Sequence, residues 1–194
     1  MADTDILYDV SQRIATVTLN RPDRLNAYTA SLGDQLRAAM RRATDDPGVR
    51  VIILTGAGRG FCAGADMDNL AAGTASGGAT LAVENPQALP PPFDPASSPD
   101  YQTVHSYFPA VPKPIIAAIN GACAGLGLVY ALYCDQRFAA AGAKFTTAFA
   151  RRGLIAEHGI SHTLPRLVGL SKALDLLVSA RKFDADEALR LGVV

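Results

Sequence analysis

The fold is decided by the stretch Val51-Ile-Ile-Leu-Thr-Gly-Ala-Gly-Arg-Gly-Phe-Cys-Ala-Gly-Ala-Asp66, a short apolar strand followed by a glycine-rich turn. A wholly apolar strand such as 51–54 is typical of a parallel sheet that is covered on both faces. Gly56, Gly58 and Gly60 miss the GxGxxG register of dinucleotide-binding loops. Small residues here let backbone N–H groups approach a ligand closely, although an ordinary tight turn has the same composition.

A second glycine-rich segment, Asn120-Gly-Ala-Cys-Ala-Gly-Leu-Gly-Leu-Val-Tyr-Ala-Leu-Tyr-Cys-Asp135, follows a predicted strand at 115–119. Its small residues predict a turn, and its apolar second half predicts a buried helix from about Gly127. Such a helix directs free N–H groups and the positive end of its dipole at whatever lies in front of it. Two such turns facing each other would supply two backbone donors for a developing oxyanion.

The same apolar run, 115–134, also imitates a membrane span and contains a small-xxx-small pattern at Gly121 and Gly125. Asn120 inside the run and the crowded glycines favour a buried strand, a turn and a buried helix instead. We therefore expect no membrane segment.

Predicted strands and helices alternate along the rest of the chain, which indicates an α/β fold in a single domain over residues 1–194. Residues 71–105 interrupt this order, and their first part is rich in Gly, Ala, Ser and Pro, so we expect a mobile loop there. The apolar end at 191–194 predicts that a C-terminal segment is missing. The other elements expected are strands at 14–19 and near 137–139, and helices from Thr29, Ser171 and Asp184.

Composition excludes several classes of protein. Lys plus Arg and Asp plus Glu both number 18, and this balance argues against a general nucleic-acid binder. The three cysteines lack CxxC spacing, which indicates free thiols in a reducing compartment. The acidic N-terminus lacks the basic start of a signal peptide, and we expect a cytoplasmic protein.

Four motifs in this order resemble the crotonase (enoyl-CoA hydratase/isomerase) superfamily. They are Leu25-Asn-Ala27, Leu54 to Asp66, Asn120 to Asp135 and Leu164-Pro-Arg-Leu-Val-Gly169. The resemblance implies a crotonase-like spiral of ββα units and action on enoyl-CoA thioesters, in fatty-acid or related acyl-CoA degradation. It implies no cofactor, because CoA is part of the substrate. It also implies a homotrimer or hexamer, to which family members contribute C-terminal helices that are absent after Leu191.

The resemblance also assigns site residues. It places two oxyanion-hole donors on the backbone N–H groups of Ala63 and Leu126, where the family usually has Gly in place of Leu126. It places CoA contacts on the following residues: Arg24, Ala27, Ala63, Gly64, Ala65, Asp66 and Leu126.

The acid–base residues depart from those of the family's hydratases. Those enzymes use two glutamates at the positions of Val129 and Phe149, and neither of these side chains transfers a proton. Glu157 remains, in a segment similar to the one where Δ3,Δ2-enoyl-CoA isomerases carry their single catalytic glutamate. One carboxylate suffices for isomerisation, because it can remove a C2 proton and return it to C4. A hydratase, an isomerase, another enolate-based enzyme and a non-catalytic acyl-CoA-binding protein all remain open.

Two alternative interpretations concern the same segment. Glu157 can instead form a structural ion pair with one of the nearby arginines, Arg151, Arg152 or Arg166. His158 and His162 have the spacing of a zinc-binding HExxH helix, but Glu157 precedes the first histidine and a third ligand is lacking, so we predict no metal site. We expect His162 to pack or to point into the substrate pocket.

Overall fold

The first sheet of the computed structural model, which describes residues 4–66 and 91–194, has five strands. Their order across the sheet is β1 (Ile6–Ser11), β2 (Ile14–Leu19), β3 (Val51–Gly56), β5 (Ile115–Ile119) and β7 (Gln136–Ala139). β1 is antiparallel to β2, and the remaining neighbours are parallel. The strands predicted at 14–19, 51–54, 115–119 and near 137–139 are therefore confirmed.

The second sheet contains four short strands, β4 (Gly60–Cys62), β6 (Ala122–Ala124), β8 (Lys144–Thr146) and β9 (Phe183–Asp184). The first three are parallel, and β9 is antiparallel to β8. The pairs β3/β4, β5/β6 and β7/β8 are consecutive in the chain, so each pair places one strand in each sheet. This repeated arrangement is the α/β spiral expected from the sequence.

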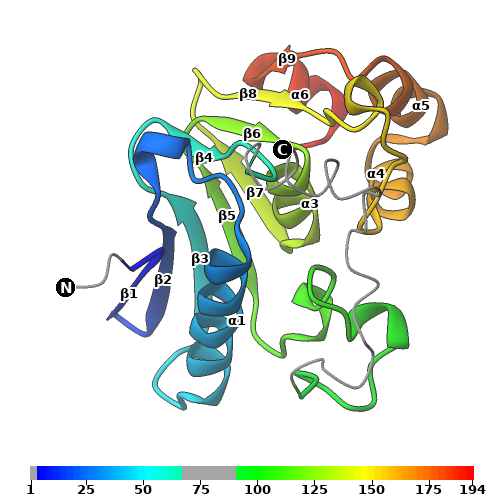
Figure 1. Ribbon diagram of the computed structural model, residues 1–194. Coiled ribbons are helices and arrows are strands. Elements are labelled where there is room, and N and C mark those ends of the chain that lie inside the picture. Colours follow the sequence, from blue (N-terminus) through cyan, green and yellow to red (C-terminus); the bar gives the residue numbers. More distant parts are fainter. Residues whose placement is uncertain (1–3, 67–90) are drawn as a thin grey trace, which may run out of the picture.

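Helix α1 (Ala30–Asp45) lies alongside the first sheet and packs on β1 and β2 (Figure 1). It begins after Thr29, whose side-chain oxygen accepts a hydrogen bond from the N–H of Leu32 at 3.2 Å, a normal N-cap. Its buried face carries Leu32, Leu36 and Met40 at helical spacing. The start predicted at Thr29 is confirmed.

Helix α3 (Leu126–Tyr133) follows the second glycine-rich segment and is buried over nearly all of its surface. The run 115–134 thus folds as β5, β6 and α3. Among the described residues, no helix is long and apolar enough to cross a bilayer.

The C-terminal part contains α4 (Ile160–Val168), α5 (Leu170–Ser179) and α6 (Ala185–Leu191). The side chain of Asp184 caps α6 by accepting a hydrogen bond from the N–H of Glu187. Helices α5 and α6 begin at Leu170 and Ala185, so the starts predicted near 171 and 184 are confirmed. Short 3-10 turns occupy Pro22–Arg24, Pro99–Tyr101, Phe108–Ala110 and Ala150–Arg152.

Residues 71–90 of the predicted mobile loop lie outside the described part of the chain. Of its remaining residues, Pro91, Pro92, Phe93 and Thr103 contact arginines on α1. Phe93 is buried and stacks on Tyr107 with ring centroids 5.0 Å apart. The guanidinium of Arg41 lies 4.0 Å from the centre of the Phe93 ring and donates to the carbonyl oxygens of Pro91 and Pro92. Phe93 thus belongs to the hydrophobic core, and the mobile loop expected over 71–105 stays a prediction.

Candidate functional site

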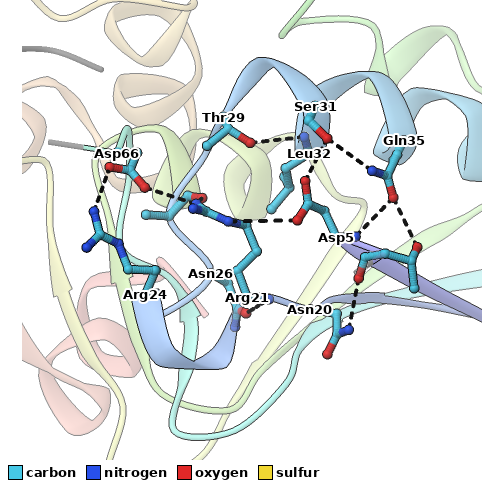
Figure 2. A network of polar contacts seen from close by, with 12 residues as sticks. Asp5, Asn20, Arg21, Arg24, Asn26, Thr29, Ser31, Leu32, Gln35 and Asp66 are labelled. Atoms are coloured by element: carbon cyan, nitrogen blue, oxygen red, sulfur yellow. Dashed lines mark hydrogen bonds and ion pairs between the residues drawn. The ribbon is translucent and has the colours of Figure 1, made fainter. Parts of the chain in front are cut away.

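The loop between β2 and α1 is joined to the first glycine-rich turn by a buried carboxylate (Figure 2). Asp66 is 4% exposed and accepts from Arg21 Nη1 at 3.0 Å and from Arg24 Nη2 at 3.1 Å. The same Arg21 nitrogen donates to the carbonyl oxygen of Ala27 at 2.6 Å. Charge pairing of this kind offsets the cost of burying a carboxylate. Three predicted CoA contacts, Arg24, Ala27 and Asp66, are therefore brought together, with the Asp66 carboxylate engaged by arginines.

Two asparagine amides shape the turn itself. Asn26 is fully buried with φ of +56°, a left-handed conformation that Asn adopts more readily than most residues. Its Nδ2 donates to the carbonyl oxygens of Ala57 and Gly60 at 3.0 and 2.8 Å. From the other side, Asn120 Nδ2 donates to the carbonyl oxygens of Gly58 and Gly60. Both amides therefore hold the backbone of the turn in one conformation.

The predicted donor Ala63 is wrong, because its N–H is already used. It donates to the carbonyl oxygen of Leu25 at 3.0 Å, which ties the turn to the first loop. A backbone N–H in such a bond is not available to a thioester oxygen. Ala63 therefore positions the turn.

The N–H of Ala65 points away from the first loop. Tyr28 and Ala65 form an isolated parallel β-bridge, in which the N–H of Tyr28 donates to the carbonyl oxygen of Gly64 and the N–H of Asp66 donates to the carbonyl oxygen of Tyr28. In this pattern the bridged residue directs its own N–H away from the partner strand. Within the described part of the chain, the Ala65 N–H has no acceptor.

Leu126 supplies the second N–H as the first residue of α3, where helix geometry leaves donors without an intrahelical partner. No described residue accepts from it. A Cβ atom added to Gly64 would lie 3.7 Å from the Leu126 nitrogen, so the two glycine-rich turns touch at this point. Gly127 packs so tightly on Cys62 that a side chain there would overlap the Cys62 carbonyl oxygen. This contact fixes α3 against the first turn.

The N–H groups of Ala65 and Leu126, which have no acceptor in 4–66 and 91–194, thus lie on adjoining turns. Such a pair is suited to hold a carbonyl oxygen that gains negative charge. The thiol of Cys62 nearby is buried, and burial raises its pKa to about 11, so it is a poor nucleophile.

The two positions that carry glutamate in the family's hydratases are apolar and buried here. Val129 is fully buried on α3, and Phe149 is 7% exposed at the end of the loop after β8. Neither side chain transfers a proton. Any acid–base chemistry at this site therefore depends on another residue.

Glu157 lies on the loop before α4, half-buried. Burial raises the pKa of its carboxyl, as expected when the charged form loses water. Among the described residues, Glu157 Oε2 lies 3.7 Å from Nε2 of His158, and none of the nearby arginines pairs with this carboxyl. Burial lowers the pKa of His158, which favours a neutral imidazole.

A histidine and tyrosine cluster adjoins this pair and was not predicted from the sequence. His105 lies edge-to-face on His158 with ring centroids 4.4 Å apart, and its Nδ1 is 2.9 Å from Tyr130 Oη. Tyr28, which forms the β-bridge with Ala65, also lies edge-to-face on His105, with ring centroids 5.0 Å apart. Burial lowers the pKa of His105 to about 3, so its ring is neutral. The cluster connects the Glu157 loop to the Ala65 turn.

Metal binding needs several ligating side chains close together. The described residues contain no group of three or more His, Cys, Asp or Glu side chains placed to hold a metal ion. The sequence-based expectation of no metal site stays a prediction.

Comparison with known proteins shows extensive similarity. The sequence profile of the family described as Enoyl-CoA hydratase/isomerase matches residues 9–194. A probable enoyl-CoA hydratase of Rhodobacter capsulatus is 36% identical over 189 residues, covering 97% of this chain and 66% of that protein. The 1,2-epoxyphenylacetyl-CoA isomerase of Escherichia coli is 34% identical over 189 residues, covering 97% of this chain and 68% of that protein.

A solved enoyl-CoA hydratase from Mycobacterium marinum is 46% identical, with a TM-score of 0.75 over 99% of this chain and 79% of that one. The chain thus spans about two thirds of the length of the curated relatives described above.

Proposed function

Because the chain belongs to the enoyl-CoA hydratase/isomerase family, we propose that it moves the double bond of a 3-enoyl-CoA thioester to the 2-position, with Glu157 as the single acid–base residue. Two observations support this proposal: the Ala65 and Leu126 N–H groups have no acceptor among the described residues, and the half-buried Glu157 carboxyl is connected to the Ala65 turn through His158, His105 and Tyr28. CoA enters as part of the substrate, and the reaction needs no further cofactor.

In the proposed reaction the Glu157 carboxylate removes a proton from C2 of the thioester. The electron pair of the broken C–H bond moves into the C1–C2 bond, and negative charge develops on the carbonyl oxygen. The N–H groups of Ala65 and Leu126 stabilise that charge. The Glu157 carboxylic acid then gives its proton to C4, and the double bond forms between C2 and C3. The proton count balances, and water is not consumed.

Isomerisation fits the described side chains better than hydration. Hydration of a conjugated thioester needs one group to deprotonate water while C2 is protonated, work usually shared by two carboxylates. Val129 and Phe149 supply neither group. A single carboxylate that carries one proton between two carbon atoms has no such requirement.

Binding of the CoA part is proposed for the loop and turn around Arg24, Ala27 and Gly64 to Asp66. The Arg24 side chain is 51% exposed beside the buried Asp66, so it lies at the surface of this region. We also propose a cytoplasmic homotrimer or hexamer that works in fatty-acid or related acyl-CoA degradation. Leu170, Leu174 and Val178 form an exposed apolar stripe on α5, which supports assembly.

The proposal is tested by replacing Glu157 with Gln and following conversion of a 3-enoyl-CoA to the conjugated 2-enoyl-CoA by absorbance and product analysis. We expect kcat to fall by about 10²- to 10⁴-fold, since the general base is lost. Thioester binding, measured by calorimetry, should change little. Glu187→Gln is the matched control, because Glu187 pairs with Arg181 on the α6 side of the molecule.

Two results would contradict the proposal in different ways. Equal turnover by Glu157→Gln and the unaltered protein removes the role given to Glu157. Binding of thioesters without any product from the unaltered protein supports the alternative, a non-catalytic acyl-CoA-binding member of the family.

A further inference from the structure

A pocket of about 400 Å³ lies beside the Glu157–His158 pair. Its lining residues are Asp100, Tyr101, Thr103, Ser106, Tyr133, His158, Gly159 and His162. We propose that this pocket receives the far end of the acyl group and selects thioesters whose acyl tail carries a hydroxyl or carbonyl oxygen there. The inference rests on the proposed function and names the substrate class of the same site.

The position of the pocket suits an acyl tail. His158 lines it and also faces Glu157 at 3.7 Å, so the pocket begins next to the proposed base. Tyr133 lies two turns beyond Leu126 on α3, about 10 Å along the helix axis at 1.5 Å per residue. An acyl group whose carbonyl is held by the Leu126 N–H reaches Tyr133 and the pocket when it runs along α3.

The lining combines polar groups with the carbon atoms of its aromatic and imidazole rings. It contains hydroxyl, imidazole, phenol and carboxylate groups, and none of its side chains is aliphatic. Pockets for unbranched alkyl tails are lined mostly by apolar side chains. A plain alkyl tail here would take water away from polar groups without giving them a new partner, which weakens its binding.

Two of the lining groups are free to meet a ligand. The Tyr101 hydroxyl and the His162 ring make no hydrogen bond to any described residue. By contrast, the hydroxyls of Thr103 and Ser106 lie 2.6 Å apart and bond to each other, and Tyr133 Oη donates to the carbonyl oxygen of His158 at 2.8 Å. Tyr101 and His162 can each donate or accept, so they match a hydroxyl or carbonyl oxygen.

The Asp100 charge also limits which acyl tails the pocket can accept. The Asp100 carboxylate lines the same space, and a negatively charged tail would be repelled by it. A neutral hydroxyl can donate to this carboxylate, while a carbonyl oxygen can accept from Tyr101 or His162. The tail is therefore oxygenated and uncharged.

The test compares two 3-enoyl-CoA thioesters of equal chain length, one ending in a methyl group and one in a primary alcohol. For the unaltered protein we expect kcat/KM to favour the hydroxylated thioester by about tenfold or more, because the pocket's polar groups stay unpaired with the alkyl tail. Tyr101→Phe and His162→Leu should each reduce this preference to within about threefold, because each removes a group that bonds to the tail oxygen. Tyr8→Phe, on strand β1, is the matched control and should keep the preference.

Each outcome decides the inference. Equal kcat/KM for both thioesters, or a preference for the alkyl one, overturns it and leaves the proposed function standing. If neither thioester is converted, the proposed function fails, and calorimetry decides the inference: about tenfold tighter binding of the hydroxylated thioester, lost in Tyr101→Phe, supports it, and equal binding overturns it. Thermal unfolding of each variant identifies any that fail to fold, and the intact His162 or Tyr101 variant then carries the comparison.

Discussion

Leu126→Pro removes one proposed oxyanion donor and keeps the helix that presents it. Proline is favoured at the first helical position, because its missing N–H would lack an intrahelical partner there in any case. The residue before a proline avoids the α region, and Gly125 with φ of 49° and ψ of −120° already lies outside it. The Leu126 N–H has no acceptor among the described residues, so its loss costs the fold no hydrogen bond that the structure describes.

The expected effect on catalysis is large. Removal of one oxyanion-hole donor typically lowers kcat by 10² to 10³, or about 2.7 to 4 kcal/mol of transition-state stabilisation. The Leu126 side chain is 5% exposed, so its truncation has a packing cost of its own, about 2 to 5 kcal/mol for a leucine in a core. Leu126→Ala carries a similar packing loss and keeps the N–H, which makes it the control.

The assay is steady-state isomerisation of a 3-enoyl-CoA, with circular dichroism and thermal unfolding of both variants. We expect Leu126→Pro to lose at least about 10² in kcat relative to Leu126→Ala at similar thioester affinity. If folded Leu126→Pro and Leu126→Ala differ in kcat by less than about threefold, the reasoning that places a catalytic donor at this N–H is refuted.

Three further predictions concern pH and packing. Burial holds the pKa of His105 at about 3 in the folded protein, against 6.5 in the unfolded chain. The stability that the neutral ring contributes is therefore present above pH 6.5 and is lost as pH falls toward 3, and the free energy of unfolding should be about 2 kcal/mol lower at pH 5. Urea unfolding should show a smaller decrease for His105→Gln. Burial raises the pKa of the Glu157 carboxyl, so the acid-side fall of kcat, recorded as a pH profile, should occur above pH 4.5, where an ordinary glutamate titrates; a midpoint at or below 4.5 would contradict this assignment. Gly127→Ala should lower the free energy of unfolding by about 1 to 3 kcal/mol, because its Cβ would overlap the Cys62 carbonyl oxygen, whereas Gly142→Ala, with no atom within 4 Å of its Cβ, should not.

The larger elements of the fold were predictable because their patterns are local. A local pattern shows which side chains of a strand or helix are buried. Such patterns are the apolar run at 51–54, the alternation at 14–19 and the helical spacing after Thr29. Strands β4, β6 and β8 have three residues each and lack a readable period. Their pairing is a property of the second sheet, so only the tertiary structure identifies them.

The family resemblance placed one donor at Leu126, and α3 begins at that residue, where the first N–H groups lack an intrahelical partner. The resemblance placed the other donor at Ala63, whose N–H is already bonded. Ala63 and Ala65 would face the same side in a regular strand, but Gly64 between them has φ of +96° and breaks the alternation. The Ala63 N–H therefore meets the Leu25 carbonyl, while the Ala65 N–H faces away from Tyr28. Composition indicates that a glycine permits such a reversal, but it does not indicate which neighbour keeps a free donor.

The surroundings of Glu157 were unpredictable because they join distant parts of the chain, and they bear directly on the choice between reactions. His105 comes from a segment without regular periodicity, yet it contacts His158 and Tyr130. The same burial that raises the pKa of the Glu157 carboxyl lowers that of both imidazoles, since low polarity disfavours every charged form. At neutral pH both imidazoles are then uncharged, and Glu157 is the carboxyl group beside them. One carboxyl group suits a reaction in which a single base carries one proton, whereas hydration usually divides the work between two carboxylates, and this difference argues for isomerisation.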